Sequence, residues 1–264
     1  MAKFSNYYKL LLYFYLMDLY EEDFPFYLKF TNEKKVLASE IRALFKKLNV
    51  KSVLDIGAGN GDLSSLLFRE VNQYTAIEPK PEFAKSLRDK GINVIEKAFP
   101  CDLGKEKYDF VLCSHSAPYS REDYKPFIEE AIKRLNNTGD LLIITYIGEG
   151  EDWNNFMEEI GVKTFEDTLS RYIERKNFLK QFRMLKEWFV FSKLESSSID
   201  DLIRALSFVA SGGEKEKRDT FFSKIEKIKN ILNLRYYDPK FKRYFFPFKH
   251  VFLMGSGMNG PTRN

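Results

Sequence analysis

The stretch VLDIGAGNGDL, from Val53 to Leu63, constrains the fold more than any other part of the chain. An apolar run leads into three glycines at alternate positions, Gly57, Gly59 and Gly61, and leucines at helical spacing follow. A strand that passes through a glycine-rich turn into a helix is the opening unit of a sheet whose crossover helices cover both faces. The sequence therefore predicts an α/β fold with a ligand site at this turn.

The same alternation of strand and helix continues along the chain. It indicates right-handed crossovers and parallel strands that are buried on both faces. The expected strands are 52–57, 74–78, 92–98, 108–115 and 140–147, and the expected helices are 33–48, 62–70, 79–91 and 122–139. We predict a Rossmann-like, mostly parallel seven-stranded sheet with flanking helices and helical cap additions.

The alternation stops near Gly148. Beyond it we expect helices at 152–161, 198–209 and 217–233, a strand near Trp188 to Phe191, and a last strand over 244–255. No repeat or long linker divides the chain, so we predict one domain over 1–264. Its expected parts are an N-terminal cap helix (1–32), a cofactor-binding core (33–161), helical additions with the last strands (162–254) and a tail (255–264).

The composition excludes several classes of protein. Hydrophobic residues make up 44% and charged residues 30%, a globular balance, and the net charge of +4 lacks the basic excess of a dedicated duplex-binding protein. Cys101 and Cys113 are too few for a disulfide framework and have no companions at metal-ligand spacing, so we predict a reducing cytoplasm and no metal. The apolar run from Leu10 to Met17 is too short to cross a membrane.

Three interpretations compete for the glycine turn. A dinucleotide fingerprint needs G-x-G-x-x-G, but Asp62 stands where its third glycine would be. A P-loop needs a lysine after its last glycine, and none follows Gly61. The third interpretation is the pattern D-x-G-x-G-x-G on a strand-to-helix turn, to which a tight connection without a ligand is the alternative. Glu78, at the end of the second expected strand, favours a ligand, because a carboxylate can accept both hydroxyls of a ribose.

The pattern D-x-G-x-G-x-G, from Asp55 to Gly61, resembles motif I of the class I S-adenosylmethionine-dependent methyltransferases. The segments YDFVLCSH and LNNTGDLLIITY resemble that family's fourth and fifth strands, and the resemblance covers Lys35 to about Gly161. It implies S-adenosylmethionine as cofactor and S-adenosylhomocysteine as product. The cofactor-binding residues that it implies are Asp55, Gly57, Ala58, Gly59, Gly61, Glu78, Pro79, Ala98, Phe99 and Ser114.

The adenine-binding part departs from the family's pattern. Ala98 occupies the position where the family often has an acid that contacts the adenine amine. Phe99 is then a candidate stacking wall, and Asp102 is a more distant acid.

The acceptor is expected beside SHSAPYSRED, because ligands of this fold bind at the carboxyl ends of the strands. His115 is a candidate proton acceptor and Tyr119 a candidate orienting group, with pocket lining and packing as the alternatives. A faint likeness of SAPY to a motif of amide and base methyltransferases is set aside, since Ala117 replaces a proline. We interpret His250, in the last expected strand, as structural.

Two further patterns bear on the acceptor. The segment 235–246, RYYDPKFKRYFF, interleaves basic and aromatic residues, which suits either single-stranded nucleic acid or a hairpin rim with inward rings. The late layout, from Asp152 to Met254, is similar to that of the histamine-type small-molecule methyltransferases. There the N-terminal and late helices cover the acceptor pocket, and the rings that would line it here are Tyr7, Tyr8, Tyr13, Phe14 and Trp153.

We therefore predict an S-adenosylmethionine-dependent methyltransferase that methylates N or O of a small-molecule acceptor. An RNA or protein methyltransferase is the first alternative, in which nucleic acid or protein is the partner. An aminopropyltransferase, or a non-catalytic module that binds S-adenosylmethionine, is the further alternative. Aminopropyl transfer generally uses paired acids near the acceptor, and SHSAPYS contains none.

Overall fold

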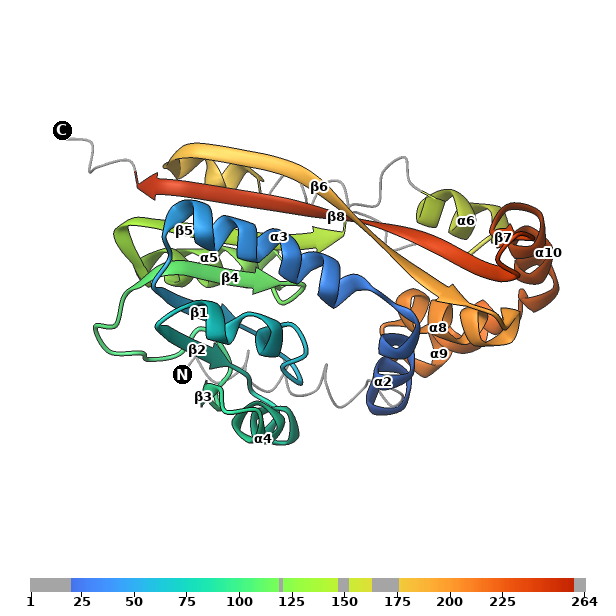
Figure 1. The fold of residues 1–264 in the computed structure, drawn as a ribbon, viewed down its shortest axis with the longest axis horizontal. Helices are drawn as coiled ribbons and strands as arrows, with labels where there is room; N and C mark the ends of the chain where they lie inside the picture. Colours follow the sequence, from blue (N-terminus) through green and yellow to red (C-terminus); the bar gives the residue numbers. More distant parts are fainter. Residues whose placement is uncertain (1–19, 119–120, 147–151, 163–175, 259–264) are drawn as a thin grey trace. The chain divides into compact units, whose positions relative to one another are not determined.

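The computed structural model describes residues 20–118, 121–146, 152–162 and 176–258, and Figure 1 labels its helices and strands. The chain divides into two compact units. The helical unit comprises Met1–Glu33, Gly148–Glu166 and Phe191–Phe248. The sheet unit comprises Lys34–Ile147, Asp167–Val190 and Lys249–Asn264. The predicted cofactor-binding residues and His115 belong to the sheet unit.

The sheet unit alternates strands and helices as the sequence predicts. Its elements are α3 (Glu33–Leu48, whose first residue is assigned to the helical unit), β1 (Ser52–Ile56), η1 (Ser64–Leu66), η2 (Phe68–Glu70), β2 (Gln73–Ile77), α4 (Pro81–Asp89), β3 (Asn93–Ile95), β4 (Tyr108–Ser114), α5 (Arg121–Lys133), β5 (Leu135–Tyr146) and η3 (Leu179–Gln181). Two long strands, β6 (Phe182–Ser196) and β8 (Arg243–Met258), belong partly to each unit.

The strand order is β3-β2-β1-β4-β5-β8-β6, and β7 (Tyr237–Asp238) adds an eighth strand by pairing with β8. The pairs from β3 to β5 are parallel, whereas β8 runs antiparallel to β5. The order reverses at β1, which lies between β2 and β4. The carboxyl ends of β1, β2 and β4 therefore meet at the switch point where ligands of open α/β sheets bind.

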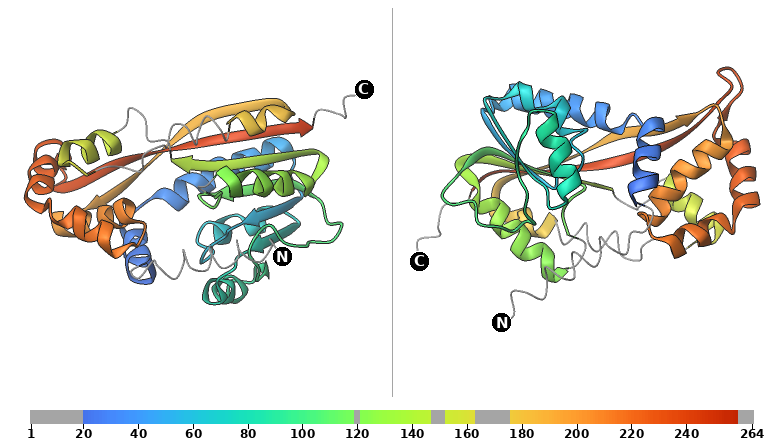
Figure 2. Two further views of the ribbon diagram at one scale, coloured as in Figure 1. Left: turned by 180° about the vertical axis from the view of Figure 1, so that it is seen from behind. Right: turned by 90° about the horizontal axis from the view of Figure 1, so that it is seen from below.

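Both faces of the sheet are buried, which explains why its central strands are apolar throughout. In β4, Phe110 and Leu112 face the cluster that contains Leu37 and Ile41 of α3. The intervening residues of β4, Val111 and Cys113, together with α5, belong to the opposite cluster. Figures 1 and 2 show α3 on one face and α5 on the other. This period-two division places α3 and α5 on opposite faces.

One expected helix is replaced by tighter turns. Over 62–70 the sequence predicts a helix, but the structure has the short 3-10 turns η1 and η2. Leu67 N–H donates to Ser64 O at 3.0 Å and Glu70 N–H to Leu67 O at 2.9 Å, which are bonds three residues apart. The connection from Asp62 to β2 is short, and Ser64 is held by a buried side-chain bond to Asp55. Both constraints favour the tighter turns.

The helical unit is built around its own aromatic core. Its elements are α2 (Tyr20–Phe30), α6 (Asp152–Ile160), α8 (Ile199–Ser211), α9 (Lys215–Phe222) and α10 (Ile225–Arg235), with β7 and parts of β6 and β8. Phe156, Phe221 and Phe246 are fully buried in this core, and Trp153 stacks on Phe156 with ring centroids 5.8 Å apart. The predicted lining residue Trp153 therefore has a packing partner.

The late helices differ in detail from those that the sequence predicts. The segment 217–233 forms the end of α9 and most of α10, with a break at Ser223 and Lys224. Gly212 closes α8 in the left-handed conformation that favours glycine, with φ of 60°.

No helix among the described residues is both long and apolar enough to cross a bilayer. The predicted acceptor-lining rings Tyr7, Tyr8, Tyr13 and Phe14 lie outside the described residues.

Candidate active site

The first glycine of the turn is required by a neighbouring loop. Gly57 has φ of 72°, and a Cβ on it would overlap Cβ of Ser116. The hydroxyl of Ser116 donates to Ile56 O, and Gly57 N–H donates to Ile77 O at 2.8 Å. The glycine turn is thereby held between β2 and the segment that follows β4. Residues just after β4 lie beside the turn for this reason.

The middle glycine of the turn has unfilled space beside it instead of packed protein atoms. Gly59 has φ of 60°, and a Cβ on it would have no heavy atom within 4 Å. Its N–H donates to Oε2 of Glu78 at 2.8 Å. Glycine at this position thus leaves an unfilled space beside the backbone, directly next to a carboxylate. A ligand can approach the chain there without meeting a side chain.

Glu78 follows β2 and is almost wholly buried, with 5% of its surface exposed. Its Oε1 accepts from Lys80 N–H at 3.0 Å, and its Oε2 accepts from Gly59. Burial raises the pKa of the Glu78 carboxyl, and the two backbone donors oppose that rise. A carboxylate has about four acceptor positions, so these two bonds leave capacity for two hydroxyls. Pro79, the next residue, is half-buried.

Asp55, the acid of the D-x-G-x-G-x-G pattern, forms hydrogen bonds to other protein side chains. Its Oδ2 accepts from Ser64 Oγ at 2.6 Å and from the hydroxyl of Tyr74 at 2.7 Å. Burial raises the pKa of Asp55, and these two hydrogen bonds lower it in part. The same burial, with the neighbouring Asp55 charge, raises the pKa of Tyr74 well above its usual value. Asp55 therefore ties β1 to η1 and β2.

Ser64 and Tyr74 were missed by the sequence analysis. Tyr74 lies in a strand whose residues from Tyr74 to Ile77 are all buried, and a hydroxyl that is buried there needs a partner. That need was a usable signal, although it does not identify the partner.

The far side of the turn is fixed by α4. Asp62, which replaces the dinucleotide glycine, accepts from Asn60 Nδ2 at 3.0 Å and pairs with Lys90 Nζ at 3.2 Å. Ser86 Oγ donates to Asn60 O at 2.9 Å. Asp62 thus has a local structural role, and Ala58 between Gly57 and Gly59 is half-buried.

The residues expected at the adenine lie in a loop after β3. Ala98 and Phe99 are both half-buried there. The ring of Phe99 packs edge to face on Phe127 of α5, with centroids 5.1 Å apart. Asp102 accepts from Gly104 N–H at 2.8 Å. A stacking role for Phe99 stays a prediction.

The acceptor candidates follow β4. Ser114 Oγ is buried and has no hydrogen-bond partner among the residues that the structure describes. His115 has φ of 55°, and its N–H donates to Ile144 O at 2.9 Å. Histidine tolerates this left-handed conformation better than most residues do, yet it is uncommon and marks a special position. Tyr119 lies outside the described residues.

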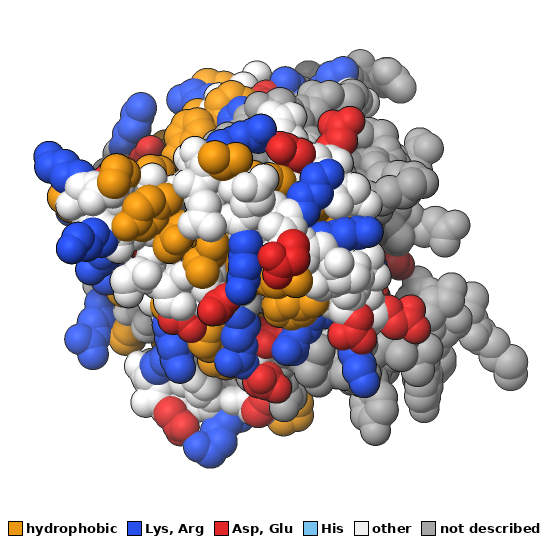
Figure 3. Space-filling model, turned by 90° about the vertical axis from the view of Figure 1, so that its right-hand side faces the viewer, with side chains coloured by type: hydrophobic (Ala, Val, Ile, Leu, Met, Phe, Trp, Pro, Cys, Tyr) orange, Lys and Arg blue, Asp and Glu red, His pale blue; other side chains and the backbone are white. Residues whose placement is uncertain are grey.

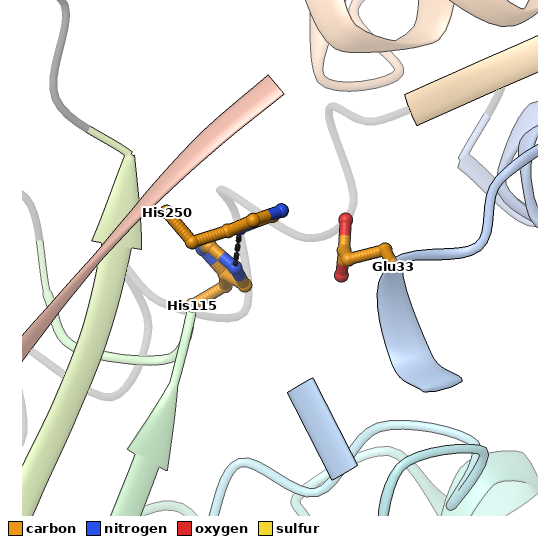
Figure 4. A group of neighbouring side chains, drawn as sticks. All are labelled: Glu33, His115 and His250. Carbon is orange, nitrogen blue, oxygen red and sulfur yellow. Dashed lines mark hydrogen bonds between the residues drawn. The ribbon is translucent and has the colours of Figure 1, made fainter. Parts of the chain in front are cut away.

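His115 has a partner that the sequence analysis did not foresee. His250 of β8 is fully buried, and its Nδ1 lies 3.2 Å from Nε2 of His115 (Figure 4). The two rings are 5.3 Å apart between centroids and inclined at 64°. Glu33, also labelled in Figure 4, belongs to the helical unit, where its carboxylate accepts from the hydroxyl of Tyr27 at 2.7 Å.

The basic and aromatic segment 235–246 forms a hairpin in the helical unit. Tyr237 of β7 pairs with Tyr244 of β8, and the rings of Tyr237, Phe241 and Phe245 are exposed by 39%, 64% and 39%. Its flanking arginines are paired, Arg235 with Glu159 and Arg243 with Glu195, each at 2.6 Å. Acidic and basic side chains are interspersed on the face drawn in Figure 3. The segment is therefore a rim with mixed ring exposure.

The arrangement around the glycine turn fits S-adenosylmethionine. Three features lie around the switch point of one sheet: the space beside Gly59, the remaining acceptor capacity of Glu78, and the hydroxyl of Ser114, which has no hydrogen-bond partner within the described part of the chain. These groups suit a ligand that presents a ribose diol and further hydrogen-bonding groups.

Comparison with known proteins agrees with this geometry. A family model described as a methyltransferase domain matches residues 29–184, which is more than half of the chain. No curated protein matches.

Solved structures with this fold are similar over most of the chain. The YcgJ protein of Bacillus subtilis has a TM-score of 0.53 and 15% identity, over 83% of this chain and 97% of its own. A protein from Bacillus halodurans C-125, described as a candidate methyltransferase, has a TM-score of 0.50 and 14% identity, over 84% of this chain and 100% of its own. At such identities the likeness shows the fold, which confirms the predicted fold class.

Proposed function

The chain belongs to the methyltransferase domain family and is an S-adenosylmethionine-dependent methyltransferase, and from this premise we propose that it methylates N or O of a small-molecule acceptor. The observation that carries the proposal is the contact of Ser116 with Gly57 and Ile56. This contact holds the segment that contains His115, the residue that we assign as proton acceptor, next to the turn that we assign to the methyl donor. An N–H or O–H nucleophile needs such a group when it arrives protonated.

We propose that the cofactor is held by the following contacts. Glu78 accepts the ribose hydroxyls, and its bond to Gly59 N–H sets the shape of the turn at the same time. The backbone of Gly57 to Gly61 borders the methionine part, with Asp55 as the group that fixes β1 to the turn. Ser114 contributes its hydroxyl from the end of β4. Pro79, Ala98 and Phe99 border the adenosine.

Bound S-adenosylmethionine supplies an electrophilic methyl carbon on a sulfonium. The protein's own part is to hold the acceptor in line with that carbon and to take its proton. Because SHSAP carries no acid, the acceptor side offers little to bind a polyamine, which disfavours aminopropyl transfer. The ion pairs of Arg235 and Arg243 disfavour a phosphate backbone as the partner of the hairpin.

Three measurements test the proposal. Calorimetry with S-adenosylmethionine and S-adenosylhomocysteine should give saturable binding of both, and no binding of either would contradict the cofactor site. A radiolabelled methyl-transfer screen should then find transfer to amines, alcohols or carboxylates and not to tRNA or protein extract. If RNA is bound with a steep dependence on salt, the acceptor class is wrong, because phosphate contacts produce that slope.

We also propose that both units serve a single enzyme located in the cytoplasm. The chain has two cysteines, Cys101 and Cys113, too few for a disulfide framework, which agrees with a reducing compartment. A helical cover over the acceptor, as in the histamine-type layout, stays a prediction.

A further inference from the structure

The contact between His115 and His250 is unusual in its placement. His250 lies inside β8, opposite Tyr146 of β5 in the antiparallel register, and is fully buried. His115 lies at the carboxyl end of β4, in the left-handed conformation and only partly buried. The chain has two histidines in all, 135 residues apart, and the fold joins their rings within the sheet unit.

A contact of 3.2 Å between two ring nitrogens is a hydrogen bond only if one of them carries a proton and the other does not. Two neutral arrangements satisfy this condition. In the first, His250 Nδ1–H donates to His115 Nε2, and the proton of neutral His115 then lies on its Nδ1. In the second, His115 Nε2–H donates to His250 Nδ1, and Nδ1 of His115 holds a lone pair.

Only the second arrangement is compatible with proton uptake by His115. A protonated imidazole donates from both nitrogens, so Nε2–H must still find an acceptor after His115 is charged. His250 Nδ1 is that acceptor in both states, without moving its own proton. The bond also becomes charge-assisted when His115 is charged, and such bonds are the stronger ones. Burial of His250 excludes water that would compete for the contact.

We propose, on the basis of the proposed function, that His250 is a positioning residue that fixes His115 in the Nε2–H tautomer and leaves Nδ1 as the base. The N–H or O–H proton of the acceptor passes to Nδ1 of His115 as the acceptor's electron pair forms the bond to the methyl carbon. The electron pair of the broken carbon–sulfur bond stays on sulfur, and His115 later releases the proton to solvent. Atoms and charge balance without another reactant.

The test uses the full chain with 15N-labelled histidine rings. Because there are two histidines, the spectrum contains four ring nitrogens, and variants at position 250 assign them. With S-adenosylhomocysteine bound, His115 should have a protonated Nε2 and an unprotonated Nδ1. His250→Asn retains an acceptor oxygen near the position of Nδ1 and should keep this tautomer. His250→Leu should give a mixture of tautomers.

The second readout is single-turnover transfer of the radiolabelled methyl group to the amines and alcohols of the screen. At saturating S-adenosylmethionine, His250→Leu should lower the rate about tenfold or more, and His250→Asn should restore most of it, while both bind the cofactor normally. Unchanged transfer by His250→Leu would overturn the role of His250.

Other outcomes separate this inference from the function on which it rests. A protonated Nδ1 on His115 in the wild-type protein overturns the inference, whatever the variants do. If a chelator changes the 15N chemical shifts of the ring nitrogens and Zn²⁺ restores them, the two histidines are metal ligands. That result would also overturn the inference. If the wild-type protein binds no cofactor or transfers no methyl group, the proposed function fails, whereas the ring spectra still decide the tautomer.

Discussion

The backbone N–H of Gly59 donates to Oε2 of Glu78 at 2.8 Å, so the open position of the glycine turn and the acid after β2 form one structural unit. The oxygen that shapes the turn therefore belongs to the same carboxylate that we propose as the acceptor of the ribose hydroxyls. Lys80 N–H fixes the other oxygen from the opposite side. A change at Glu78 should therefore affect both the ligand and the turn.

Glu78→Ala should weaken binding of S-adenosylmethionine by roughly 1–3 kcal/mol, or about fivefold to 150-fold, because ribose hydroxyls and Gly59 N–H lose their acceptor. Calorimetry measures the change. Glu82→Ala, at an exposed position of α4, is the matched control and should bind normally. Normal binding by Glu78→Ala would show that the ribose assignment is wrong.

The two glycines Gly57 and Gly59 should respond differently to alanine. Both have positive φ, so each substitution strains the backbone by about 1–2 kcal/mol. Gly57→Ala also overlaps Ser116 and should mainly lower the thermal stability. Gly59→Ala meets no protein atom and should mainly lower cofactor affinity. Thermal unfolding and calorimetry on both variants separate the effects. Equal effects on affinity would contradict a ligand position in the space beside Gly59.

Ser114 and Ser116 form a second pair of contrasting positions. In the ligand-free protein, Ser114→Ala should be neutral or slightly stabilising, since it removes a buried hydroxyl that lacks a partner among the described residues. It should nevertheless weaken cofactor binding. Ser116→Ala removes a donor to Ile56 O and should lower stability by about 1 kcal/mol. If Ser114→Ala binds S-adenosylmethionine as the wild type does, Ser114 is not a ligand.

The pH dependence of stability should include a contribution from Asp55. Burial raises its folded-state pKa above the usual 3.8, so the folded protein holds a proton that the unfolded chain has lost. Stability from this group is therefore present below pH 3.8 and declines as pH rises through the folded-state pKa. Denaturant unfolding of the wild type and Asp55→Asn across this range measures the decline. The wild type should lose stability relative to Asp55→Asn as the pH rises, and a constant difference would contradict the shift.

Local patterns were sufficient for most of the sheet unit. Period-two and helical spacing placed β1, β2, β4, α3 and α4, since those patterns depend on neighbours within one element. Glu78 was predicted to lie at the ligand site because it follows β2, and the carboxyl ends of parallel strands share one edge of the sheet. The turn after Asp62 was predicted as a helix, wrongly, since its spacing resembles one while a side-chain bond to Asp55 and a short connection favour 3-10 turns.

The sequence alone indicated the fold class and the position of Glu78, because both follow from periodicity along the chain, and its resemblance to motif I of a known family implied the methyl donor. The tertiary structure decided which groups meet: Asp55 with Tyr74, Ser116 with Gly57, and His115 with His250. These contacts depend on the register between neighbouring strands of the sheet, and the histidine contact depends on the antiparallel pairing of β8 with β5. Periodicity within a segment carries no information about that register, so the histidine pair could be found only in the folded chain.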